Sequence, residues 1–199
     1  MNLQTFFLII STIAGFITSI YAIYSVLVGT YKPQRMTRLI FLIINSIIFF
    51  SLIYLGNQIS IWLVGTQFLT SIILTLLSLK YGIGGQSKSD LFVLFLAIFT
   101  IVIWQTTKNS FLALNLSVLV HLIGISPTIN KCFKLTHTEE PKLYLLDLIA
   151  GTFSILALTV FNWSTIIYPI YIFCINLLCF SLIFIGRKFR TISNSKMVT

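Results

Sequence analysis

The chain alternates long apolar stretches with short polar turns. Seven apolar segments can be recognised, at residues 3–28, 39–55, 61–79, 91–107, 111–129, 143–161 and 166–186. Most of them approach the roughly 20 residues that a helix needs to cross a bilayer, and we expect the fourth to be the shortest helix. The pattern therefore predicts an all-α membrane protein with seven transmembrane helices.

The amino-acid composition and the short turns limit the classes of protein to which this chain can belong. Hydrophobic residues make up 57% of the chain and charged residues only 9%, whereas a soluble domain carries about 25% charged residues. The turns are too short to hold a soluble domain, so any binding or transport path is expected inside the helix bundle. The sequence contains no paired acid and base, no activated nucleophile and no cysteine spacing typical of metal sites. We therefore expect neither an enzyme nor a bound metal or cofactor.

The basic residues alternate between turns. If the N-terminus lies outside, the inner side holds all of the 13 Lys and Arg residues except Lys108. The positive-inside rule then predicts an outside N-terminus and a cytoplasmic C-terminus. The net charge of +9 is accordingly assigned to the lipid boundary and not to nucleic acid. We expect a multi-pass protein of the cell membrane, such as the inner membrane of a bacterium.

An internal repeat relates the two halves of the chain. A shift of 108 positions places segment 39–55 on 147–163 and segment 61–79 on 169–187 without a gap, and Pro33 falls on Pro141. A three-helix unit has an odd number of spans, so one additional helix is needed to give its copy the same orientation. The sequence thus predicts a 3+1+3 arrangement of parallel triple-helix bundles, with a solute path where they meet. The expected parts are bundle 1 (1–81), a linker helix (82–108), bundle 2 (109–190) and a cytoplasmic tail (191–199).

Several polar side chains interrupt the apolar segments. Asn45, Gln67 and Asn115 carry amides that donate and accept hydrogen bonds at once, which suits neutral hydroxylated solutes. Buried without partners, such groups cost about 1–3 kcal/mol each. They can face a cavity, or they can bond to neighbouring helices as small polar contacts. Both interpretations stay open from the sequence.

Two ionisable residues lie within apolar segments. His121 is a functional candidate by default, because intramembrane ionisable groups are rare, and its alternative is a packing residue bonded to Ser117 or to a neighbouring helix. Asp147 is expected near the inner surface, where it would pair with Lys131 or Lys134 as a gate, or as a salt bridge that only orients its helix. The two acidic residues before Pro141, Glu139 and Glu140, are expected to be solvated or to help start the next helix through its dipole. Asp90 is expected to cap the fourth helix.

A proline inside the fifth segment is a further candidate functional residue. Pro127 removes one backbone hydrogen bond from a helix, so we expect a hinge there. With the stretch Lys134-Leu-Thr-His-Thr-Glu-Glu-Pro141 that follows Pro127-Thr128, the chain resembles the SWEET and PQ-loop superfamily of small transporters. In that superfamily the first helix of each repeat carries such a proline, but here Ser19 occupies the matching position in repeat one. The family's mid-membrane asparagine corresponds to Asn176, and to Gln67 within one position.

The resemblance implies a transporter. It would be a SWEET-like facilitator that moves a small polar solute, such as a sugar, vitamin or amino acid, by rocking two bundles around a central site. One alternative is a non-transporting receptor or accessory subunit of the same fold that binds a peptide or protein partner, as in the KDEL-receptor branch. Another is a proton-coupled carrier that uses His121 or Asp147, because the unperturbed pKa of histidine is near 6.5.

The aromatic residues of the last segment, Tyr168, Tyr171 and Phe173, can form an apolar wall or simply pack. The expected partners are a small-molecule solute and the lipid bilayer, without nucleic acid, and a homo-oligomer is left open.

Overall fold

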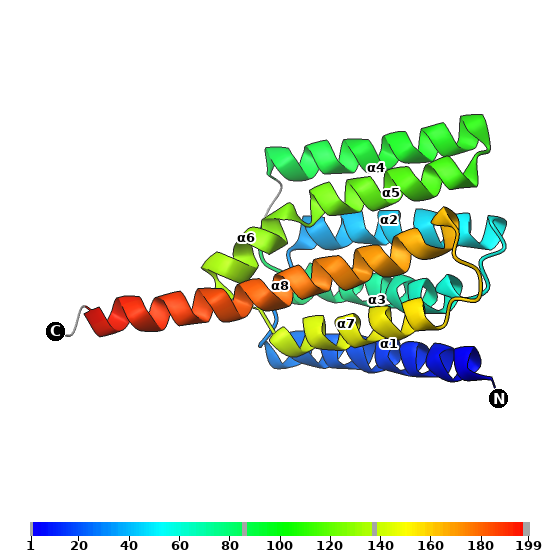
Figure 1. Ribbon diagram of the computed structural model, residues 1–199. Coiled ribbons are helices and arrows are strands. Elements are labelled where there is room, and N and C mark those ends of the chain that lie inside the picture. The colour runs from blue at the N-terminus through cyan, green and yellow to red at the C-terminus, as the bar shows by residue number, and fades with distance from the viewer. Residues whose placement is uncertain (1, 85–86, 137–138, 197–199) are drawn as a thin grey trace.

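The computed structural model describes the backbone of residues 2–84, 87–136 and 139–196, and the side chains of these residues apart from Pro127 and 189–196. The described residues are folded into α-helices joined by short turns, and no β-sheet occurs among them (Figure 1). The helices are α1 (Leu3–Val28), α2 (Arg35–Tyr54), α3 (Ser60–Tyr81), α4 (Lys88–Thr107), α5 (Ser110–Gly124), α6 (Ser126–Lys134), α7 (Pro141–Leu156) and α8 (Trp163–Lys196).

Several of these helices are long and apolar enough to cross a membrane, as the sequence predicted. They are α1, α2, α3, α4, the stretch Ser110–Lys134 formed by α5 and α6, and Trp163–Lys188 of α8. The sixth apolar segment forms α7, whose 16 residues rise about 24 Å, less than the roughly 30 Å of a hydrocarbon core. The expectation that the fourth segment would be the shortest helix is therefore wrong, because α4 has 20 residues.

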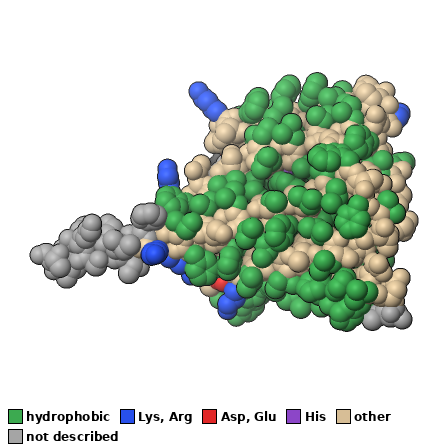
Figure 2. Space-filling view, viewed as in Figure 1, with side chains coloured by type: hydrophobic (Ala, Val, Ile, Leu, Met, Phe, Trp, Pro, Cys, Tyr) green, Lys and Arg blue, Asp and Glu red, His purple; other side chains and the backbone are tan. Residues whose placement is uncertain are grey.

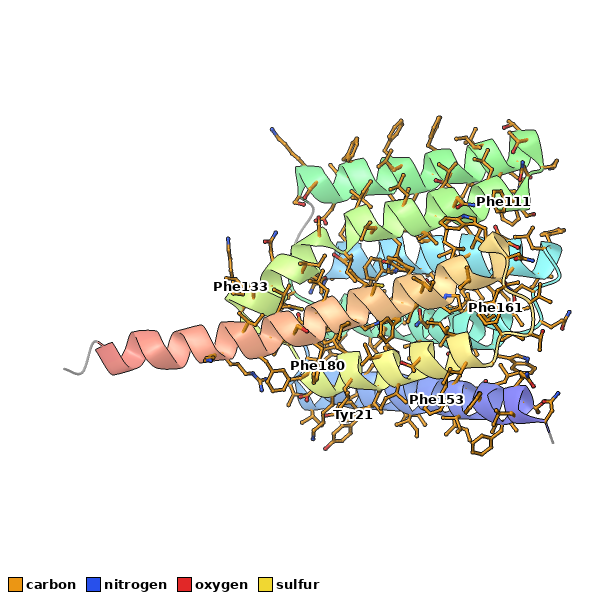
Figure 3. All side chains as sticks on the ribbon, viewed as in Figure 1. Tyr21, Phe111, Phe133, Phe153, Phe161 and Phe180 are labelled. Carbon is orange, nitrogen blue, oxygen red and sulfur yellow. The ribbon has the colours of Figure 1, made fainter. Side chains whose placement is uncertain are left out.

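Hydrophobic side chains also cover the outside of the bundle. They occupy most of the face in Figure 2, with Lys and Arg side chains towards its ends. Exposed aromatic residues such as Phe111, Phe133 and Phe161 lie on this outer surface (Figure 3). A soluble protein rarely exposes so continuous an apolar surface, whereas lipid chains solvate it readily.

Local sequence signals define several helix ends. The Asn2 side chain caps α1 by accepting from the Thr5 backbone at 2.8 Å, and Gly29 with φ of +84° ends that helix. Ser87 and Asp90 form a capping box at the start of α4, so the predicted cap is confirmed. Asp90 also accepts from Gln34 Nε2 at 3.1 Å, which ties α4 to the start of α2.

The helices pack as a closed ring. Helix α3 lies between α1 and α2, and α8 lies between α7 and the stretch formed by α5 and α6. Contacts of α2 with α5 and of α1 with α7 close the ring. Helix α4 stays outside it, against α5 and α2, and forms one edge of the bundle in Figure 1.

The bundle has two ends that differ in charge. The basic end is the end at which α2, α4 and α7 begin, and the opposite end is the one at which α1, α3, α5 and α8 begin. Helix α8 projects beyond the bundle at the basic end and continues to Lys196 (Figure 1). Residues 191–196 of the predicted tail are therefore helical, and 197–199 lie outside the described residues.

Candidate functional site

A polar cavity of about 170 Å³ lies inside the ring of helices. It is lined from α1, α2, α3, α5, α6, α7 and α8, so side chains distant in sequence meet in it. Five of the predicted site residues line it, namely Asn45, Gln67, His121, Asp147 and Asn176.

Asn115 lies elsewhere. It is not among the described residues that line the cavity. Its Oδ1 accepts from Trp163 Nε1 at 2.7 Å and its Nδ2 donates to the Phe111 carbonyl oxygen at 2.7 Å, near the opposite end of the bundle. The amide thus joins α5 to the start of α8. This fits the alternative in which Asn115 bonds a neighbouring helix, and not the one in which it faces a cavity.

Asn45 presents an open acceptor. Its Nδ2 donates to Ser71 Oγ at 2.6 Å, which orients the amide. Its Oδ1 is buried and has no hydrogen-bond partner among the described residues. A buried acceptor without a partner costs about 1–3 kcal/mol, so this atom is suited to accept from water or a solute in the cavity.

Two further amides line the same cavity and are held in place from α8. Gln67 Oε1 accepts from the buried Tyr168 hydroxyl at 2.6 Å. Asn176 Nδ2 donates to the Ile172 carbonyl oxygen one turn earlier, at 2.8 Å. Both sets of contacts are polar, so α8 contributes hydrogen bonds to the site in addition to packing.

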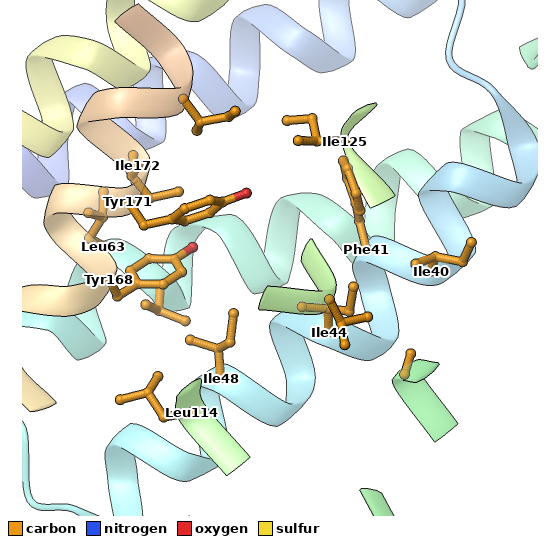
Figure 4. Packing of buried hydrophobic residues seen from close by; sticks show 14 of the residues in the cluster. Ile40, Phe41, Ile44, Ile48, Leu63, Leu114, Ile125, Tyr168, Tyr171 and Ile172 are labelled. Carbon is orange, nitrogen blue, oxygen red and sulfur yellow. The ribbon is translucent and has the colours of Figure 1, made fainter. Parts of the chain in front are cut away.

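His121 is bonded to a neighbouring helix. Its Nδ1 lies 2.5 Å from the Tyr171 hydroxyl, and its ring stacks on Phe41 with centroids 4.2 Å apart. Ser117 is not its partner, since the Ser117 hydroxyl is buried without a hydrogen-bond partner among the described residues. Figure 4 shows Tyr171 and Tyr168 side by side on α8, facing α2. These tyrosines therefore combine an apolar ring with a hydroxyl that bonds a cavity residue.

Asp147 has other neighbours than those predicted. Thr18 of α1 lies near its carboxylate, although the Thr18 hydroxyl donates to the Ala14 carbonyl oxygen at 2.9 Å, and Arg38 of α2 lines the same cavity. Lys131, one of its two predicted partners, instead pairs with Glu139 across the turn, with Nζ and Oε1 2.7 Å apart. The prediction of a pair between Asp147 and Lys131 is thus wrong, because Glu139 reaches the ammonium first.

Glu139 is buried, contrary to the expectation that it would be solvated. Its side chain is 2% exposed, so it is not solvated, and it also accepts from the Tyr144 hydroxyl at 2.6 Å. The reason is that the fold places Glu139 in the cavity lining, beside Lys131 and Tyr144. A carboxylate buried this deeply needs the Lys131 charge and the Tyr144 hydroxyl to offset its desolvation.

Charged and aromatic residues build the basic end of the cavity. The Arg38 guanidinium lies 5.3 Å and the Lys131 ammonium 5.8 Å from the centre of the Tyr31 ring, and Arg38 also donates to the Tyr31 hydroxyl. From the sequence, Arg38 is expected at the lipid boundary and Lys131 as a partner of Asp147. A signal was nonetheless present, since Arg38, Phe41 and Asn45 share one face of α2 at the spacing i, i+3, i+7.

The opposite end of the cavity is closed. Ser60 Oγ donates to the Thr165 carbonyl oxygen at 3.0 Å, and Asn57 Nδ2 donates to the Ser164 carbonyl oxygen at 3.4 Å, so α3 and α8 are joined at their starts. Below these bonds lies a buried apolar cluster drawn in Figure 4, which includes Ile48, Leu63, Leu114 and Tyr168. Polar lining is therefore found from the middle of the bundle to the basic end.

The helix carrying Pro127 is broken beside the cavity. Helix α5 ends at Gly124, Ile125 forms a turn, and α6 begins at Ser126 with Pro127 in its first turn. Proline has no backbone N–H. In the first turn of a helix this loses no hydrogen bond, because an N–H at that position would have no acceptor within the helix. Ile125 and Thr128 line the cavity on either side of this break. That it acts as a hinge stays a prediction.

The pair of Lys131 and Glu139 gives a first test of this geometry. Lys131→Met should destabilise the protein by about 3 kcal/mol, because it leaves the buried Glu139 carboxylate without its cation. The double variant Lys131→Met/Glu139→Gln should recover most of that loss. Thermal unfolding in detergent measures both, and Lys88→Met, an exposed cation of α4, serves as the control. A single variant no less stable than the double variant would contradict the pairing.

Comparison with known proteins adds no assignment to this site. No protein-family model matches the chain, and no matching protein was found among curated proteins or solved structures.

Proposed function

We propose that this protein is a membrane transporter that moves a small polar solute across the cell membrane by alternating access. The observation that carries the proposal is the polar cavity in the middle of the bundle, closed at one end by cross-helix hydrogen bonds and apolar packing and lined to the other end by charged side chains. The proposed site consists of Asn45, Gln67, His121 and Asn176, with Asp147 near the basic end.

The order of helices in the ring supports two parallel bundles. In the first unit, α1 to α3, the third helix lies between the first and second. In the second unit, α5 to α8, the last helix again lies between the broken first helix and α7. The contact of α2 with α5 has its counterpart in the contact of α7 with α1. This pattern is what two like-oriented units joined by an outer linker helix, α4, would produce.

The size of the cavity supports a compact substrate. At about 170 Å³ it is slightly larger than the engineered cavity of about 150 Å³ that binds benzene. A solute of roughly one ring, or of comparable open-chain size, therefore fits without rearrangement. The open Asn45 acceptor would bond a hydroxyl or amine of such a solute.

A proton-coupled carrier is the second candidate. The observation that favours it is the placement of His121 and Asp147 on one cavity, which Arg38 also lines. In that case replacement of either residue would abolish uptake driven by a pH gradient and leave solute exchange intact. A receptor of the same fold would bind its ligand without any flux.

Flux measurements in liposomes test the proposal. Purified protein should pass at least one labelled solute from a panel of sugars, nucleosides, amino acids and vitamins down its gradient. Asn45→Ala should slow that flux about tenfold, which corresponds to the loss of one or two hydrogen bonds. Asn115→Ala is the matched control and should leave it unchanged, because Asn115 lies outside the cavity. The absence of flux for every solute would refute a transport function.

A further inference from the structure

Among the described residues, four charged side chains line the cavity, and they fall into two groups. Lys131 and Glu139 neutralise each other at 2.7 Å. Arg38 and Asp147 do not form an ion pair within 4.0 Å with each other or with another described residue, although both line the same space. They approach it from α2 and from α7, on different sides of the ring. The cavity therefore holds one positive and one negative side chain whose charges are not matched by contact.

Each of these two charges has few polar contacts. Arg38 donates to the Tyr31 hydroxyl, whereas the hydroxyl of Thr18, a neighbour of Asp147, donates to the Ala14 carbonyl oxygen at 2.9 Å. Both side chains therefore keep most of their hydrogen-bonding capacity unused, because a guanidinium has five donors and a carboxylate accepts at about four sites. Both residues are only partly buried, so this capacity is accessible from the cavity.

Possible solutes differ in how well they would neutralise these two charges. A neutral solute would displace water from both charges and pair with neither, which is costly where the surroundings are apolar. A simple anion or cation would satisfy one charge and leave the other desolvated. A solute that carries an ammonium and a carboxylate would satisfy both, and each contact would be a charge-assisted hydrogen bond.

We propose, building on the transport function above, that the substrate is a compact zwitterion of the amino-acid type, whose carboxylate binds Arg38 and whose ammonium binds Asp147. The carboxylate end then lies at the Tyr31 side of the cavity. The Arg38 guanidinium offers the planar fork that a carboxylate accepts in bidentate fashion, which a lysine would not. Asn45, on the same face of α2, is left to bond the remainder of the solute.

Blocked analogues test this proposal directly. Binding to purified protein is measured by thermal shift and by displacement of a labelled hit, with compact neutral L-amino acids, their amides, their N-acetyl derivatives and uncharged polyols of similar size. At least one free amino acid should bind, and blocking either end should weaken it about 10- to 100-fold, as expected for one charge-assisted bond.

Variants of Arg38 and Asp147 should give a pattern of analogue binding that a purely structural role of these residues would not produce. Arg38→Gln should lose the free amino acid about 10- to 100-fold while binding its amide at least as well as the wild type does, because the amide has no carboxylate to neutralise. Asp147→Asn should likewise retain the N-acetyl derivative and lose the amino acid. Lys32→Gln and Glu140→Gln, which remove charges from the neighbouring turns, are the matched controls and should bind all analogues unchanged.

The outcomes separate this inference from the function on which it rests. Liposome flux of polyols, sugars or nucleosides without any binding of amino acids would overturn the zwitterion assignment and leave transport standing. Equal loss of all analogues in both variants would also overturn it. An amino acid that binds with the expected crossover but is never transported would support the site and refute transport.

Discussion

A disulfide between positions 60 and 165 should stop transport completely and reversibly. Ser60 Oγ already bonds the Thr165 carbonyl oxygen at 3.0 Å, so the two backbones lie close together at the closed end of the cavity. A cross-link there would hold the starts of α3 and α8 together. Alternating access requires this end to open once in every cycle, so flux should cease when the bond forms.

The cross-link experiment needs a background without native thiols. Cys132, Cys174 and Cys179 are replaced first, and Ser60→Cys/Thr165→Cys is then oxidised in liposomes and reduced again. Flux should fall to the level of empty liposomes and return on reduction, whereas each single cysteine should transport normally. Solute binding should persist in the oxidised form, because the basic end is unaffected. Unchanged flux in a fully cross-linked sample would show that this end does not have to open.

Gly186→Val should prevent correct packing of α6 against α8. A side chain at Gly186 would place its Cβ 2.4 Å from the Phe133 carbonyl oxygen and 2.7 Å from Thr136 Cγ2. The first of these atoms belongs to the backbone and cannot move aside without displacing α6. Overpacking of this kind costs about 1–3 kcal/mol when side chains can adjust, so we expect at least the upper value here.

Size-exclusion profiles and thermal unfolding in detergent check this prediction. Gly186→Val should give a low yield of monodisperse protein and a clearly lowered unfolding midpoint. Gly65→Ala is the matched control, since its Cβ would meet only Phe49 Cε2 at 3.4 Å, an ordinary van der Waals contact. Its stability should stay within about 0.5 kcal/mol of the wild type, as is usual away from packed features. A stable Gly186→Val protein would mean that α6 does not cross α8 at this point.

Features that depend on neighbours in sequence were predictable. Apolar length alone predicts helices that can cross a membrane, because lipid requires every backbone group to bond within its own helix. The cap at Asp90 follows from the spacing of Ser87 and Asp90, since both groups belong to the same turn. The break near Pro127 follows equally from local chemistry, because proline has no backbone donor.

Features that depend on how each helix is rotated in the bundle were not predictable to the same degree. Asn45 and Asn115 are both lone asparagines in apolar helices, yet one lines the cavity and the other holds Trp163. The sequence around each amide is equally apolar, so only packing against neighbouring helices decides which side faces inward. The same holds for Arg38, whose charge resembles that of any basic residue at a membrane boundary until the fold places it on the cavity beside Tyr31.

The amino-acid sequence by itself therefore determined that this chain is helical and apolar enough for a membrane, where most helices start and stop, and which few polar groups had to be explained. The tertiary structure decided which of these groups meet, which charges pair and which end of the cavity is closed. The physical reason is the separation along the chain of the residues involved. Helix formation and apolar length depend on residues close in sequence, whereas the cavity is formed by side chains such as Asn45 and Asn176 that only the ring of helices brings together.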